Sequence, residues 1–258
     1  MNLRIITSII LSLALFQPLF AGSIEKVYDN GLKLIVLQDH RAPVVVSQLW
    51  YHVGSSYEHE GITGVSHALE HLMFKSTENV AAGEFSRVVA ENGGSDNAFT
   101  GKHYTAYFQR IASESLELCI RYEADRMNGL IFDTDEFERE MDVIREERSL
   151  RVDNNPLSQF YERFIAAVYS RSSLRHPVIG WPEDIQQLEL DETKEWYQRW
   201  YVPNNATLVI AGDVQFDEVD DLVMKYFSGI PARPLQPVKS RPEPPQNGLK
   251  VIRGYGQT

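Results

Sequence analysis

His67-Ala68-Leu69-Glu70-His71 is the stretch from which the fold and the chemistry of this chain can be inferred. On an α-helix, positions i and i+4 differ by about 40° around the axis, so both histidines project from one face, one turn apart. Two neutral imidazoles at that spacing can hold one zinc ion. Glu70 lies about 60° to the other side of His67, so it can reach a water on that ion and accept a proton without being a ligand. The motif therefore predicts the core of a zinc-peptidase site.

The surroundings of this motif favour a metal site over a solvated helix that carries two histidines by chance. Leu72, Met73 and Phe74 follow the motif and suit packing, and Gly61 and Gly64 precede it. The pair of histidines is therefore expected next to a structured loop.

A third zinc ligand is expected from the acidic segment 135–152, because catalytic zinc usually has three protein ligands and a water. Glu140 and Glu147 are seven positions apart and share a face of the predicted helix. Glu146 points about 100° away from Glu147. Periodicity alone does not choose between Glu146 and Glu147 as the ligand.

The composition suits a folded chain that does not bind nucleic acid. Of its 258 residues 43% are apolar, which is enough to bury a core. The formal net charge of −11 disfavours non-specific binding to nucleic acid. Cys119 is the only cysteine in the sequence, so no internal disulfide can form. Its apolar neighbours predict a buried, inert thiol.

Residues 1–21 have the pattern of a cleavable signal peptide of the Gram-negative type. Arg4 supplies a positive start, residues 5–16 are mainly apolar, and small residues surround a cleavage point after Ala21. A membrane span needs about 20 apolar residues, so this run is too short to be an anchor. We expect export, to the periplasm, and no membrane attachment after cleavage.

The patterns of apolar and polar residues predict an α+β domain over residues 22–230. Strands mixed with long helices indicate one mixed, mainly antiparallel sheet with helices mainly on one face. Strands are expected at residues 26–28, 32–38, 44–53, 97–100, 104–110 and 206–211. Helices are expected at residues 65–74, 83–91, 113–128, 135–152, 157–169, 191–200 and 217–227.

The composition changes after residue 230. Residues 231–247 are rich in proline and charged side chains, which is typical of a linker. Residues 248–255 have the pattern of another strand. We therefore expect residues 248–258 to begin a second half, and the chain to be the N-terminal part of a longer protein.

Further motifs accompany the first. Glu147 ends the run Glu140-Met-Asp-Val-Ile-Arg-Glu-Glu147. Other recognisable runs are Leu72-Met73-Phe74-Lys75-Ser76-Thr77, Asn92-Gly93-Gly94, Asn97-Ala98-Phe99-Thr100, His176-Pro177-Val178-Ile179-Gly180 and Trp200-Tyr201-x-Pro203-Asn204-Asn205-Ala206-Thr207-Leu208. In this order they resemble the inverted-zincin peptidases, a family that includes pitrilysin, insulysin and the β-subunit of the mitochondrial processing peptidase. The resemblance covers nearly all of residues 23–237.

The resemblance assigns expected roles. It favours Glu147 over Glu146 as the third ligand of one zinc ion, beside both histidines of the motif. It makes Glu70 the general base and Glu140 a carboxylate that supports the site from behind the ligands.

Asn97, Ala98, Phe99 and Thr100 resemble the edge strand of this family, on which an extended peptide substrate lies and pairs through its backbone. In that mode main-chain hydrogen bonds give affinity and side-chain pockets give selectivity. The alternative for Asn97 is a turn residue after the two glycines.

The sequence departs from the family pattern in two ways. His103 stands where the family usually has an acidic residue, and we expect it to be a surface residue at the start of a strand. Members of the family also pair two homologous halves, in one chain or as two subunits, and the second half contributes an arginine and a tyrosine that help to bind substrate. The resemblance therefore implies a second half, in the same chain or as a partner subunit. This half alone is expected to be weakly active or inactive.

The predicted function is a zinc-dependent endopeptidase that hydrolyses extended peptides or small unfolded proteins. The alternative is a non-catalytic binding or assembly subunit of the same fold. Such subunits typically lack a ligand or the base, whereas His67, Glu70, His71 and Glu147 are all present. The complete set favours the enzyme.

Overall fold

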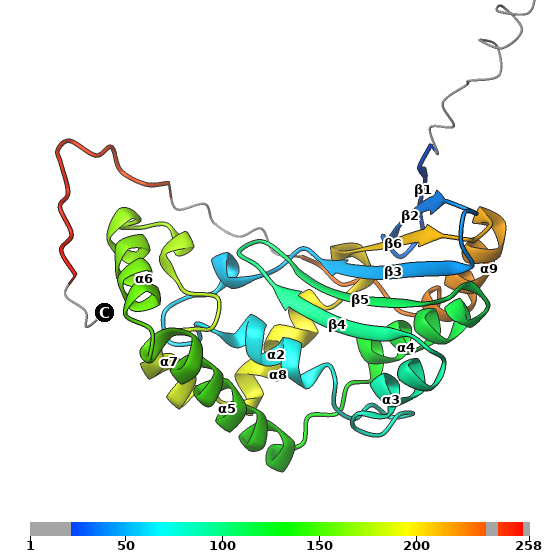
Figure 1. The fold of residues 1–258 in the computed structure, drawn as a ribbon, viewed down its shortest axis with the longest axis horizontal. Helices are drawn as coiled ribbons and strands as arrows, with labels where there is room; N and C mark the ends of the chain where they lie inside the picture. The colour runs from blue at the N-terminus through cyan, green and yellow to red at the C-terminus, as the bar shows by residue number, and fades with distance from the viewer. Residues whose placement is uncertain (1–21, 236–241, 255–258) are drawn as a thin grey trace, which may run out of the picture.

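A computed structural model describes residues 22–235 and 242–254, and a mixed sheet forms the centre of these residues (Figure 1). Its six strands have the order β1-β2-β6-β3-β5-β4. Strands β2 and β6 are parallel, and every other neighbouring pair is antiparallel, as predicted. The strands are β1 (Ile24–Val27), β2 (Lys33–Gln38), β3 (Val44–Tyr51), β4 (Ser95–Thr100), β5 (Thr105–Ala112) and β6 (Ala206–Gly212).

The helices lie mainly on one side of the sheet, which confirms the predicted fold class. Figure 1 shows α3 and α4 below the strands and α9 beside their right-hand ends, while α5, α6 and α7 extend away from the sheet on the far side of α2. The helices are α2 (Val65–Leu72), α3 (Glu84–Glu91), α4 (Leu116–Gly129), α5 (Thr134–Arg148), α6 (Pro156–Val168), α7 (Pro182–Gln187), α8 (Leu190–Trp200) and α9 (Phe216–Phe227).

Strand β3 shows why the sheet has one covered face. Val45, Ser47, Leu49 and Tyr51 are fully buried, and the residues that alternate with them are partly exposed. Side chains alternate between the two faces of a strand, so this pattern buries one face against the helices and leaves the other open. Cys119 of α4 is buried in the same core, as predicted.

The helix predicted over residues 135–152 is present, but it is α-helical only as far as Arg148. It ends as α5 at Arg148, a π-helical turn spans Ser149–Asp153, and α6 begins after Asn155. Arg148 is buried, and its guanidinium donates to both carboxylate oxygens of Glu162 on α6, at 2.9 and 2.8 Å. This ion pair ties α6 to the end of α5 across 14 positions, which local periodicity cannot predict.

The strand pattern of residues 248–255 does not become a strand in residues 248–254. This segment has no neighbouring strand to pair with and lies against α6 instead. Lys250 Nζ donates to the backbone oxygen of Ala167, and Gln246 Nε2 to that of Val168, each at 3.1 Å. The predicted signal peptide, 1–21, and residues 236–241 of the predicted linker lie outside the described residues.

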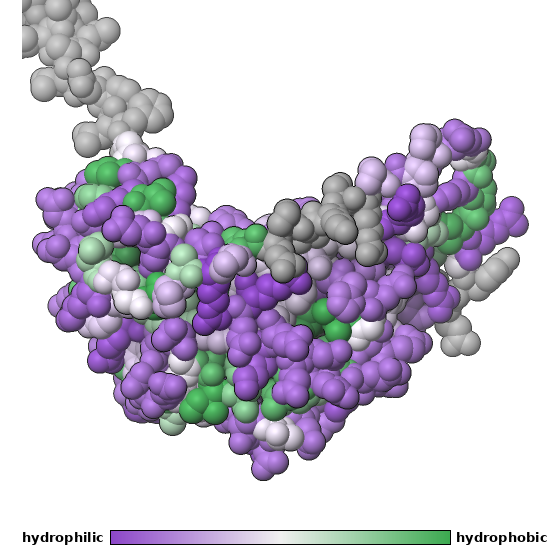
Figure 2. All heavy atoms as spheres, turned by 180° about the vertical axis from the view of Figure 1, so that it is seen from behind, coloured by the Kyte–Doolittle hydropathy of each residue, from purple (hydrophilic) through white to green (hydrophobic). Residues whose placement is uncertain are grey.

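The face of the molecule opposite to the view of Figure 1 is mainly hydrophilic. Figure 2, which shows the molecule from behind, has apolar patches only as separate spots among polar side chains. Within residues 22–235 and 242–254, no helix has the length and apolar character needed to cross a membrane.

Candidate metal centre

Helix α2 is held in place by tight packing at its start and by its apolar face. Gly64, just before the helix, has a φ of 93°, which favours glycine, and a Cβ there would lie 2.7 Å from the backbone oxygen of Ile179. Leu69 is fully buried under the sheet. The helix is therefore fixed in rotation, and both histidines of the motif face α5.

Three predicted ligands come together between α2 and α5. Glu147 Oε2 lies 3.7 Å from His67 Nε2 and 3.4 Å from His71 Nε2. One ligand atom from each residue lies within 4.8 Å of the other two. Ligand atoms about 2.0–2.1 Å from a tetrahedral zinc ion are roughly 3.4 Å apart, so the spacing fits one ion with only small adjustments. Glu146, the alternative from periodicity, is exposed to solvent.

The other oxygen of the Glu147 carboxylate has a separate partner. Arg151 donates to Glu147 Oε1 at 2.6 Å. This contact leaves Oε2 directed at the two imidazoles. Arg151 was not among the predicted site residues, although its i,i+4 spacing from Glu147 is a recognisable signal for an ion pair.

Glu140 supports His71 from the side opposite the ligand cluster. His71 Nδ1 lies 3.1 Å from Glu140 Oε2, and Lys75 Nζ lies 2.5 Å from the other oxygen. Burial lowers the pKa of His71, but the hydrogen bond to Glu140 and the nearby carboxylates outweigh it and raise the pKa overall. The bond from His71 and the charge of Lys75 lower the pKa of Glu140. A carboxylate on Nδ1 leaves Nε2 free for a metal ion.

His67 is kept neutral by its surroundings. Its side chain is buried, and burial lowers its pKa to about 3, with a smaller effect from the charge of His71. A neutral imidazole has a lone pair to offer to a metal ion. Among the described residues, its buried Nδ1 has no hydrogen-bond partner.

Glu70 lies beside the cluster and is bound to the edge strand. Its Oε2 accepts a hydrogen bond from the Thr100 hydroxyl of β4. Burial raises the pKa of Glu70, and the bond from Thr100 partly opposes that rise. A carboxylate with a raised pKa, held next to a metal site, is suited to accept and return a proton.

Removal of the Thr100 hydroxyl is predicted to change the pH dependence of any activity that needs ionised Glu70. Thr100→Val deletes a bond that stabilises the carboxylate, so the pKa of Glu70 rises further. The acid limb of the pH profile of kcat/KM should therefore move to higher pH, with activity recovering as pH rises. Thr207→Val, on β6, is the matched control. An unshifted acid limb in Thr100→Val would contradict this role.

The predicted substrate strand forms an edge of the sheet. Within the described part of the chain β4 pairs with β5 alone, so its outer edge is open to an added strand. Asn97 and Phe99 are exposed, and Ala98 and Thr100 are half-buried. Asn97 thus belongs to the strand rather than to the preceding turn. All four predicted substrate residues line the same cavity as the ligand cluster.

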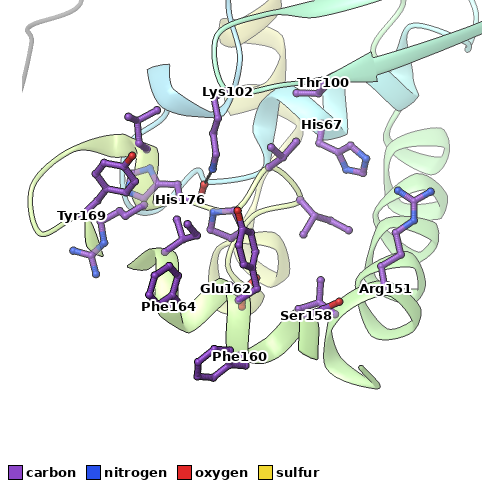
Figure 3. Close-up of a pocket in the computed structure, with 18 of the residues that line it drawn as sticks. His67, Thr100, Lys102, Arg151, Ser158, Phe160, Glu162, Phe164, Tyr169 and His176 are labelled. Carbon is purple, nitrogen blue, oxygen red and sulfur yellow. Dashed lines mark hydrogen bonds between the residues drawn. The ribbon is translucent and has the colours of Figure 1, made fainter. Parts of the chain in front are cut away.

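That cavity has a volume of about 1580 Å³. Figure 3 shows His67 and Arg151 on one side of it and Tyr169 on the opposite side, with Phe160 and Phe164 of α6 below. His103 does not line the cavity; it is exposed and lies 2.7 Å from the Ser56 hydroxyl, as expected of a surface residue.

Comparison with known proteins identifies the family. Residues 33–180 match the model of the insulinase family, peptidase family M16. The chain belongs to this family. Residues 187–257 match a second M16 model, which is described as the inactive domain. The boundary between the two matches falls at α7, and β6, which comes after it, belongs to the same sheet as the five strands before it.

Relatives of this M16 chain are named as zinc proteases. It is 35% identical to the zinc protease PqqE of Helicobacter pylori over 86% of this chain and 51% of that protein. It is 31% identical to a zinc protease of Mycobacterium leprae over 80% of this chain and 46% of the relative. The chain therefore spans about half the length of the curated relatives it matches.

Solved structures agree with this assignment. A protease from Helicobacter pylori superposes with a TM-score of 0.83 at 32% identity, covering 86% of this chain and 54% of that one. The first half of the periplasmic protease PqqL from Escherichia coli has a TM-score of 0.75 at 26% identity, covering 86% of this chain and 48% of that one. This M16 chain thus has the fold of one peptidase half.

Proposed function

We propose that this M16 chain carries the catalytic site of a zinc-dependent endopeptidase that hydrolyses extended peptides. The proposal rests on the convergence of His67, His71 and Glu147, whose ligand atoms lie within 4.8 Å of one another. The carboxylate of Glu70 lies beside them and is not one of the three converging groups. The same arrangement faces an open edge strand in a large cavity.

The donor set fits zinc. Two imidazoles and one carboxylate are a common catalytic zinc set, and it leaves a fourth position open. Zinc bound there would polarise the peptide carbonyl and make a water molecule more acidic. Glu140 holds the ring of His71 in the required orientation, and Arg151 holds Glu147.

Glu70 acts as the proton carrier in this proposal. Its carboxylate takes a proton from the attacking water and returns it to the leaving amine. Thr100 keeps that carboxylate beside β4, where the scissile bond of a strand-added peptide would lie. Asn97, Ala98 and Phe99 continue the same edge and orient the peptide through backbone pairing.

Turnover is proposed to need a second homologous half, in the same chain or as a partner subunit. The curated relatives are about twice as long as this chain. Small unfolded proteins and peptides are the proposed substrates, because only an extended backbone can pair with an edge strand. Export to the periplasm remains a proposal based on residues 1–21.

The alternative, a non-catalytic subunit, is less well supported. A subunit that only binds or assembles needs neither a base nor three converging ligands, and this chain has both. No observation on the described residues favours assembly over catalysis.

The test is hydrolysis of a fluorogenic peptide by the chain, with and without the second half. We expect activity to disappear with a chelator, to return with zinc, and to rise when the second half is added. Cleavage that resists the chelator would contradict a zinc mechanism. Equal activity with and without the added half would contradict the need for two halves.

A further inference from the structure

Glu58 is a buried carboxylate whose place in the fold none of the roles above explains. Its side chain is 3% exposed, and it lies in the loop between β3 and α2. Glu58 Oε2 accepts the backbone N–H of Gly64 at 2.8 Å, and Oε1 accepts that of Ser66 at 2.9 Å. Both N–H groups lie at the start of α2, where a helix offers them no acceptor of its own. This helix carries His67, Glu70 and His71.

The start of α2 depends on this carboxylate. The N-cap residue, Gly64, has no side chain, so it cannot satisfy the free N–H groups of the first turn. Negative charge at a helix N-terminus is favourable because the peptide dipoles sum to a partial positive charge there. Burial raises the pKa of Glu58 to about 7, opposed by its bonds to Gly64 and Ser66 and by the charge of Lys102.

The same loop, residues 54–58, is bound at its other end to the β4–β5 turn. Ser55 N donates to Gly101 O at 3.1 Å, and Ser56 N donates to Lys102 O at 2.8 Å. The Ser56 hydroxyl also donates to Lys102 O, at 2.6 Å. Gly54 lies so close to this turn that a Cβ would be 2.3 Å from Gly101 O.

We propose that residues 54–58 form a coupling loop that sets the position of the zinc helix relative to the substrate strand, with Glu58 as its positioning residue. One end of the loop binds the turn that directly follows β4, and the other end binds the first turn of α2. Within this loop Glu58 is the charged residue, and both of its carboxylate oxygens bind the start of α2.

The consequence for catalysis follows from the geometry. Thr100 ends β4 and binds Glu70, so the base contacts the strand at a point next to the turn that the loop holds. Helix α2 has eight residues, and a shift at its first turn is passed on to His67, the third residue. A displacement of about 1 Å between reacting groups can reduce the rate by about 100-fold.

The experiment replaces Glu58 with glutamine. Glutamine keeps the shape of the side chain but places an NH₂ group against one of the two backbone N–H groups that Glu58 binds.

This proposal rests on the zinc-peptidase function, so zinc affinity and kinetics are measured separately, on the zinc-loaded chain together with its second half. We expect kcat to fall about 10- to 100-fold with KM changed by less than about threefold, and the zinc Kd to rise about 10-fold. Glu60→Gln, in the exposed part of the same segment, is the matched control and should match wild type.

The results distinguish the positioning role of Glu58 from the zinc-peptidase function on which it rests. If Glu58→Gln lowers Tm but leaves kcat and the zinc Kd unchanged, Glu58 is merely structural and the proposal is overturned. If Glu58→Gln does not fold, Glu58→Asp decides: it keeps the charge but cannot reach both N–H groups, so an unchanged kcat and zinc Kd would overturn the proposal. If wild type binds zinc but cleaves no peptide, the peptidase function fails, while a changed zinc Kd in Glu58→Gln still supports the positioning of α2.

Discussion

Glu70→Gln is expected to lower kcat by about 100- to 10,000-fold while zinc stays bound. The amide has the shape of the carboxylate and can still accept a hydrogen bond from Thr100, so the edge strand and α2 should keep their places. It cannot accept a proton from water. Because Glu70 is not among the three converging ligands, zinc affinity should change little.

Two measurements on one preparation check this result. Zinc content per chain comes from atomic absorption, and kcat comes from a fluorogenic peptide with the second half present. Glu60→Gln again removes one exposed negative charge from the approach to α2 and should retain wild-type kcat. Full activity in Glu70→Gln would rule out the general-base role, and loss of zinc would make Glu70 a ligand instead.

The motif residues were predictable because their relation is local. Spacing along one helix fixes which side chains share a face, and the structure has His67, Glu70 and His71 on α2 as expected. Strand β3 was predictable from the β-branched and aromatic residues of its own segment. The family resemblance extended this to Glu147, and the exposure of Glu146 now gives the physical reason.

The parts that could not be predicted depend on contacts between distant segments. Arg148, the last residue of α5, pairs with Glu162 on the next helix, 14 positions away. The bonds of Glu58 to the start of α2 cross a loop whose conformation has no periodic signal. The strand pattern after residue 248 failed because a strand needs a neighbour, and the described residues offer none at that point.

Substitution of Glu147 tests the metal site most directly. Glu147→Gln is expected to weaken zinc binding by more than about 100-fold, since groups that merely support ligands already account for about 10- to 100-fold. An amide oxygen is a poorer ligand than a carboxylate, and Arg151 loses its partner as well. Peptide cleavage should disappear with the metal and reappear in part at high zinc concentration.

Glu146→Gln is the control that makes the result specific. It removes the same charge from the next position of the same helix, but its side chain is exposed to solvent, away from the two histidines. Long-range attraction of the acidic helix for zinc would make both variants bind more weakly by similar factors, and added salt would reduce that loss. Direct coordination confines the effect to Glu147, because Glu147 Oε2 alone lies between His67 and His71. Equal zinc affinities in the two variants would therefore reject Glu147 as the third ligand.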